Sequence, residues 1–177
     1  MVRIRRVVIC TESRLYWDAD SEPAKCRNDD HEHRVFETHR HLNPVVLPDG
    51  TQLTAASFDP VAPYSRDRDP DYGLYLDSRW QPPWAHDHID WPDFGLPADT
   101  EAVVEALKAV LERARSGQNI EVGCIGGHGR TGTALACLAV LSGQPAVDAV
   151  AWVRSNYCVK AVETPEQEAF VAALVTR

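Results

Sequence analysis

The segment between residues 120 and 141 constrains the fold more than any other part of the chain. The short apolar run Ile120–Cys124 is followed by a loop with three glycines, and then by the almost wholly apolar stretch Thr131–Leu141. A run of the first kind indicates a strand, and a helix that is apolar on every side has to be buried. This segment therefore predicts an α/β fold in which a glycine-rich loop joins a strand to a buried helix.

The flanking sequence predicts β-rich structure before this segment and helices around it. Pro48-Asp49-Gly50 separates two β-rich runs, which is typical of a hairpin turn. The expected strands are 6–11, 73–76 and the hairpin 44–57, and the expected helices are 98–116, 146–156 and 165–176. We expect a single domain over residues 1–177, whose β-rich portion at 1–80 extends the central sheet or covers one side of a cleft.

Cys124 and Arg130 bracket the glycine-rich loop. A cysteine and an arginine reach this spacing readily by chance, so the inference depends on the context. Glycines let successive backbone N–H groups turn inward, and the N-terminus of the following helix adds positive charge. A thiol beside such groups is stabilised as the thiolate, while a guanidinium matches two oxygens of a phosphate. The loop is therefore expected to bind phosphate next to a nucleophile.

With a second motif, Trp91-Pro92-Asp93, the chain resembles the cysteine-dependent protein tyrosine phosphatase and dual-specificity phosphatase superfamily. The family signature, a cysteine, five residues, an arginine and then Ser or Thr, is met by Cys124, Arg130 and Thr131. The segment 163–167, Glu-Thr-Pro-Glu-Gln, is similar to the family segment that carries a water-positioning glutamine. The resemblance covers about residues 86–177 and suggests an atypical, bacterial-like member.

The resemblance implies a fold, a mechanism and a set of site residues. The fold would be a central mixed β-sheet flanked by α-helices. Cys124 would form a phosphocysteine, Asp93 would act as acid and then as base, and Gln167 would orient the hydrolytic water. Thr131 would donate a hydrogen bond to the sulfur. The phosphate-binding residues would be Ile125, Gly126, Gly127, His128, Gly129 and Arg130, and the acid loop would contain Trp91, Pro92 and Asp93. No cofactor or metal is expected.

Two positions depart from the family pattern. Gly123 stands where the family usually has a histidine that helps to lower the pKa of the thiol. His128 lies on the loop itself, where it either favours a more anionic substrate or is simply exposed at the surface. No motif selects an aromatic residue that would clasp phosphotyrosine.

The remaining cysteines and histidines have mostly structural explanations. The alternating spacing of His31, His33, His39 and His41 suits a solvated strand face better than a metal site. Cys10, Cys26, Cys137 and Cys158 are expected to be structural, because an odd set of five without a CxxC pair favours neither disulfides nor zinc.

The net charge of −8 is concentrated in one segment. Residues 57–101 hold ten acidic and three basic groups, so a broad basic surface for nucleic acid or membranes is missing. No run approaches the length of a membrane span, and we expect a cytoplasmic protein. An acidic rim beside the phosphate loop favours a phosphate carried on a neutral or basic partner.

Three functions are compatible with these observations. The first is a phosphatase of phosphotyrosine or mixed phosphoresidues in proteins. The second is a phosphatase of small anionic phosphates such as nucleotides, phosphoinositides or inositol phosphates, and the third is an inactive phosphate-binding module. The sequence leaves the oligomeric state open.

Overall fold

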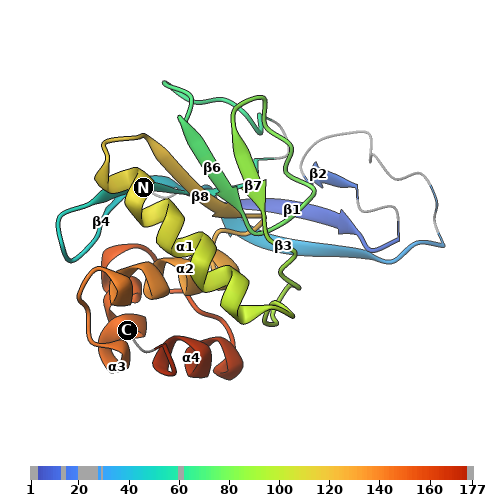
Figure 1. Ribbon diagram of the computed structural model, residues 1–177. Coiled ribbons are helices and arrows are strands. Elements are labelled where there is room, and N and C mark those ends of the chain that lie inside the picture. Colours follow the sequence, from blue (N-terminus) through green and yellow to red (C-terminus); the bar gives the residue numbers. More distant parts are fainter. Residues whose placement is uncertain (1–3, 13–14, 20–27, 29, 60–61, 175–177) are drawn as a thin grey trace.

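The fold is centred on a five-stranded mixed sheet. The computed structural model describes residues 4–12, 15–19, 28, 30–59 and 62–174. The sheet has the order β4-β5-β8-β6-β7, with only β4 and β5 paired antiparallel (Figure 1). Its strands are β4 (Leu42–Val46), β5 (Gln52–Ser57), β6 (Tyr72–Tyr75), β7 (His86–His88) and β8 (Ile120–Cys124). The expected mixed sheet and the hairpin are thus confirmed, whereas β7 was not foreseen.

Helices cover the sheet around one buried helix at the centre. They are α1 (Thr100–Arg115), α2 (Gly129–Leu141), α3 (Ala146–Asn156) and α4 (Pro165–Ala172). Every residue of α2 from Gly129 to Val140 is buried, as its apolar sequence predicts. The side chain of Asp99 caps α1 by accepting a hydrogen bond from the Ala102 N–H. The last helix ends at Ala172, which is earlier than expected.

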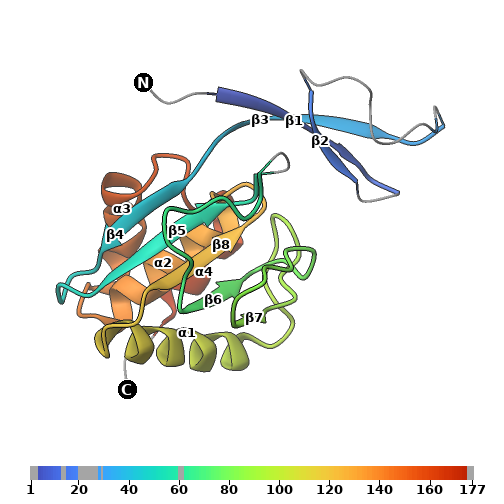
Figure 2. The ribbon, with the colours of Figure 1, turned by 90° about the horizontal axis from the view of Figure 1, so that it is seen from above.

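The N-terminal strands form a second, separate sheet. It has the order β2-β1-β3, and all its pairs are antiparallel, with β1 (Ile4–Cys10), β2 (Tyr16–Asp18) and β3 (His33–His39). Figure 2 shows this sheet beside the central one. The expectation that the β-rich portion 1–80 extends the central sheet holds for β4, β5 and β6 and is wrong for β1, β2 and β3. Pro44 helps to keep β4 at the edge of the central sheet, because a proline cannot donate a ladder hydrogen bond to a further strand.

A buried ion pair supports the central strand β8. Glu121 is 1% exposed and accepts hydrogen bonds from Arg66 Nε at 2.7 Å and from Arg66 Nη2 at 2.9 Å. The Tyr75 hydroxyl donates to the same carboxylate at 2.9 Å. A buried carboxylate needs such partners, so this network fixes β8 only three residues before Cys124.

Candidate active site

The end of β8 and the start of α2 place Cys124 inside the phosphate loop, which comprises residues 124–130. The sulfur of Cys124 accepts hydrogen bonds from the Gly127 N–H at 3.2 Å and from the Thr131 hydroxyl at 3.0 Å. Gly127 has a φ of 72°, which lets its N–H turn toward the sulfur. Two donors therefore converge on this one sulfur.

Other loop residues are held by their neighbours. The Phe58 N–H lies within hydrogen-bonding distance of the carbonyl oxygens of Cys124, at 3.2 Å, and Ile125, at 3.1 Å. The Gly129 backbone is closely approached by Glu163, since a Cβ at Gly129 would lie 2.3 Å from Glu163 Oε2. The loop is therefore packed on both sides and leaves little freedom for substitution.

The structure gives a physical reason for Gly123. A Cβ at this position would lie 2.7 Å from Cζ3 of Trp80 and 2.8 Å from the Ala56 carbonyl oxygen. Trp80 is fully buried on the face of the sheet opposite α2. A tryptophan ring therefore occupies the space that the usual histidine would need, and sequence reasoning missed this residue because nothing links positions 80 and 123 along the chain.

Arg130 is anchored from behind by three acceptors. Its Nη1 donates to the carbonyl oxygens of Leu76 and Trp91, both at 3.0 Å, and to the Asp77 carboxylate at 2.9 Å. Its Nε is buried and has no hydrogen-bond partner among the described residues. The anchored guanidinium thus leaves one buried donor without a hydrogen bond among the described residues.

The charges around Arg130 keep it ionised. Burial alone would lower the pKa of this guanidinium, but attraction to Cys124, Asp93 and Asp77 raises it above its usual value. Asp77 was not foreseen as a site residue. A usable signal existed, because Asp77 directly follows the predicted strand 73–76, and the carboxyl ends of parallel strands meet at one edge of a sheet.

The acid loop, residues 91–97, lies directly over the phosphate loop. Trp91 is 2% exposed, and its indole N–H donates to the Gly95 carbonyl oxygen at 2.8 Å. Pro92 and Asp93 are exposed. Asp93 Oδ1 lies 3.2 Å from Arg130 Nη2, so the structure brings the two predicted residues together.

Gln167 links the acid loop to the start of α4. It is fully buried, its Oε1 accepts from the Glu163 N–H at 2.9 Å, and its Nε2 donates to the Gly95 carbonyl oxygen at 3.4 Å. The helix cap is supplied by Thr164 instead. The amide thus stands beside the acid loop.

His128 is not exposed at the surface, so that expectation is wrong. The residue is 6% exposed, and its Nε2 lies 3.2 Å from Nε2 of His41. His41 is itself 2% exposed and does not belong to a solvated strand face, which corrects a second expectation. Of the other cysteines expected to be structural, Cys10, Cys137 and Cys158 are buried, whereas Cys26 lies outside the described residues.

A pocket of about 480 Å³ opens between the acid loop and the N-terminal sheet. Asp93, Phe94 and Arg130 line it from one side, and Cys10 and Arg34 line it from the other. The N-terminal sheet therefore covers one side of the cleft, as one of the two expectations stated. The full lining is Cys10, Thr11, Arg34, Asp77, Ser78, Arg79, Asp90, Trp91, Pro92, Asp93, Phe94 and Arg130.

Comparison with protein families points to the same chemistry. Residues 92–171 match a family model described as the DSP-PTPase phosphatase domain of Swiss Army Knife proteins. Two uncharacterized proteins of Methanocaldococcus jannaschii, MJECL20 and MJ0215, are each 38% identical over 111 residues, which cover 55% of this chain. These residues span 71% of MJECL20 and 66% of MJ0215.

Solved structures share the fold. The active form of Tk-PTP is 29% identical with a TM-score of 0.54, and the match covers 67% of this chain and 88% of that one. A kinase associated phosphatase has a TM-score of 0.60 and is 14% identical, and the match covers 74% of this chain and 92% of that one. A mouse putative dual specificity phosphatase has a TM-score of 0.57 and is 15% identical, and the match covers 72% of this chain and 82% of that one. The family model and the fold shared with Tk-PTP together support membership in the superfamily of cysteine-dependent protein tyrosine and dual-specificity phosphatases.

Proposed function

We propose that the protein hydrolyses phosphomonoesters through a phosphocysteine on Cys124, with a phosphorylated protein or peptide as its substrate. The observation that carries this proposal is the sulfur of Cys124, which accepts hydrogen bonds from Gly127 and Thr131 at the base of the phosphate loop. A thiolate held in this way attacks phosphorus, while Arg130 and the loop amides stabilise the equatorial oxygens.

The remaining steps use Asp93, Gln167 and Thr131. Asp93 protonates the leaving oxygen and then takes a proton from the water that attacks the phosphocysteine. Gln167 orients that water from its position beside Gly95. The Thr131 hydroxyl stabilises the sulfur when the S–P bond breaks. The reaction consumes one water and returns Cys124 as the thiolate.

The pocket supports an aromatic phosphate on a protein. Phe94 follows Asp93 directly, is 52% exposed and lines the pocket. An exposed ring at this place offers stacking to a phenyl group. It supplies the aromatic contact that no sequence motif identified.

A second candidate is a phosphatase of small, more anionic molecules such as nucleotides, phosphoinositides or inositol phosphates. Arg34 on the N-terminal sheet lines the same pocket, and its side chain is 61% exposed. A second guanidinium at the rim would suit a second anionic group. His128 gives this candidate no support, because its ring is buried against that of His41.

The Cys124→Ser variant tests the nucleophile. We expect it to lose turnover of p-nitrophenyl phosphate while it still binds vanadate, whereas Cys137→Ser, which changes a buried thiol on α2, keeps turnover. Acid quenching during turnover should trap one phosphate per chain on Cys124 in the wild type. Unchanged turnover in Cys124→Ser would refute the assignment. Activity on phosphotyrosine peptides, phosphoserine peptides and inositol phosphates then separates the two substrate classes.

A further inference from the structure

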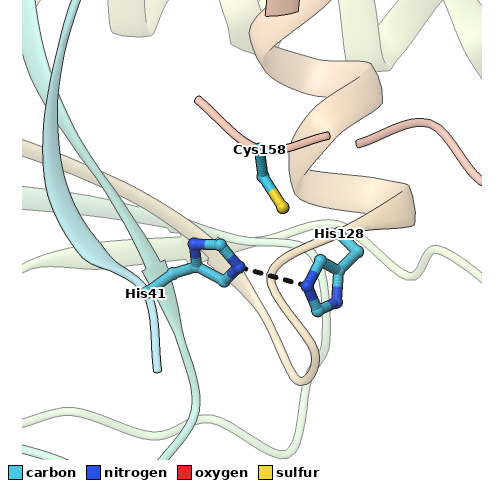
Figure 3. A group of neighbouring side chains, drawn as sticks. All are labelled: His41, His128 and Cys158. Atoms are coloured by element: carbon cyan, nitrogen blue, oxygen red, sulfur yellow. Dashed lines mark hydrogen bonds between the residues drawn. The ribbon is translucent and has the colours of Figure 1, made fainter. Parts of the chain in front are cut away.

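A cluster of two histidines and one cysteine lies behind the phosphate loop, and the proposed reaction uses none of these three side chains. It consists of His41, His128 and Cys158, which are 2%, 6% and 7% exposed. Their ligand atoms all lie within 4.8 Å of one another. Figure 3 shows both imidazole rings and the sulfur of Cys158 directed toward a common space. Imidazole nitrogen and thiolate sulfur are the donors that Zn²⁺ prefers in proteins.

We propose that this cluster, called here the rear site, binds one Zn²⁺ ion and thereby fixes the phosphate loop from behind. The two Nε2 atoms of His41 and His128 are 3.2 Å apart. Two nitrogens bound to one tetrahedral Zn²⁺ at about 2.0–2.1 Å lie about 3.3 Å apart. The histidines therefore already have the spacing of a zinc pair, and the sulfur of Cys158 lies within 4.8 Å of a ligand nitrogen of each.

The three ligands come from three separate parts of the chain that meet at the loop. His41 precedes β4, and its backbone is fixed by Ser57, whose hydroxyl accepts from the His41 N–H at 2.8 Å. His128 is part of the phosphate loop and directly precedes α2. Cys158 lies in the connection between α3 and α4. An ion bound here would join all three, so its effect would be to restrict the loop.

The phosphate loop packs closely against this cluster. A Cβ at Gly127 would lie 2.8 Å from Cδ2 of His41, so the loop closes directly on the histidine ring. The Tyr157 hydroxyl donates to the Gly127 carbonyl oxygen at 2.6 Å, and its ring lies 4.7 Å from that of His41. The rear site thus contacts the same glycine whose N–H faces the catalytic sulfur. The side chains of the rear site have no part in the proposed reaction, so the ion would have a structural role and take no part in the chemical step.

Zinc binding would be linked to protonation. The ion binds the Cys158 thiolate and neutral imidazoles, so binding releases the thiol proton and replaces the hydrogen bond between the two histidines. Water would complete the tetrahedron as the fourth ligand. A hydrogen-bonded histidine pair that never takes up a metal is the competing explanation, and the experiment below distinguishes the two.

The test is metal binding to the full chain in the Cys124→Ser background, which removes the catalytic thiolate as a competing ligand. After chelator treatment, Zn²⁺ is titrated against a chromophoric chelator, and Co²⁺ is added in parallel to detect a sulfur-to-cobalt charge-transfer band. We expect one equivalent of Zn²⁺, a cobalt band, and a higher melting temperature with zinc. Cys158→Ala should lower zinc affinity by more than about 100-fold and abolish the band.

Three controls make the outcome decisive. Cys137→Ala removes a buried thiol elsewhere and should leave zinc binding unchanged. Cys10→Ala tests the other cluster of possible ligands among the described residues, which contains Cys10, Glu12 and His31. His41→Gln, whose fold is checked by circular dichroism, should repeat the loss seen in Cys158→Ala. The proposal is overturned if no zinc binds, if Cys158→Ala and His41→Gln bind normally, or if binding depends on Cys10. Since Cys124 is absent throughout, these outcomes are independent of the proposed phosphatase mechanism.

Discussion

The ring of Trp80 fills the space into which a side chain at Gly123 would project. A Cβ there would lie 2.7 Å from Trp80 Cζ3. Where the family usually has a histidine before the nucleophile, this protein has a tryptophan ring from a distant loop. The donors that the Cys124 sulfur does have are the Gly127 N–H and the Thr131 hydroxyl.

Placing the family's histidine at position 123 should lower the stability of the protein. We expect Gly123→His to destabilise the protein, and even Gly123→Ala to cost about 1–3 kcal/mol, because the added atoms overlap Trp80 and the Ala56 carbonyl. Urea denaturation measures this loss of unfolding free energy. A Gly123→His variant as stable as the wild type and faster in turnover would contradict the steric explanation.

The Thr131 hydroxyl should act mainly on the second step. Removing it in Thr131→Ala takes one of two donors from the sulfur, so breakdown of the phosphocysteine should slow by about 10²–10³-fold. Rapid-quench kinetics should then show a burst of product followed by a slow steady state. Equal slowing of burst and steady state would mean that the hydroxyl does not preferentially stabilise the departing sulfur.

Asp93 should matter most for poor leaving groups. We expect Asp93→Ala to lower kcat by about 10²–10⁴-fold on phenyl phosphate and by much less on p-nitrophenyl phosphate, whose leaving oxygen needs little protonation. The matched control is Asp90→Ala, an exposed carboxylate that lines the same pocket. If Asp90→Ala shows the same leaving-group dependence, the assignment of Asp93 fails.

Asp77 should make stability depend on pH. Burial alone would raise the pKa of this carboxyl, but hydrogen bonds from Arg79 and the charge of Arg130 hold it below its usual value. A lowered folded-state pKa means that the stabilisation is present above about pH 4 and is lost as the pH falls through the folded value. Asp77→Asn should cost about 3 kcal/mol at neutral pH and less in acid. Urea unfolding across pH checks this, and a cost that does not vary with pH would contradict it.

The buried ion pair of Arg66 and Glu121 should contribute more to the free energy of unfolding than exposed ion pairs do. Arg66→Ala leaves the carboxylate of Glu121 buried without its main partner, so we expect a loss of about 3–5 kcal/mol. Arg68→Ala removes an arginine whose side chain is 73% exposed and should cost less than about 1 kcal/mol. Thermal and urea melts compare the two, and similar losses would show that the pair does not carry this stability.

Local patterns in the sequence determined the parts of the protein that depend on neighbouring residues. The glycines of the loop, the apolar stretch 131–141 and the stripe of α1 identify a strand, a loop and helices because backbone conformation and burial follow local composition. The order of the Cys124, Asp93 and Arg130 motifs also indicated the family. The helices, the hairpin and the mixed sheet appear in the structure as expected.

Only the tertiary structure decided what depends on contacts between distant residues. The separate N-terminal sheet, the contact of Trp80 with Gly123 and the approach of His41 to His128, 87 positions away, are set by packing across elements. The alternating histidines suggested a solvated strand, yet burial of His41 results from the loop that closes over it. Side-chain burial is a property of the assembled fold, and for this reason neither the anchoring of Arg130 by Asp77 nor the rear site could be inferred from the sequence.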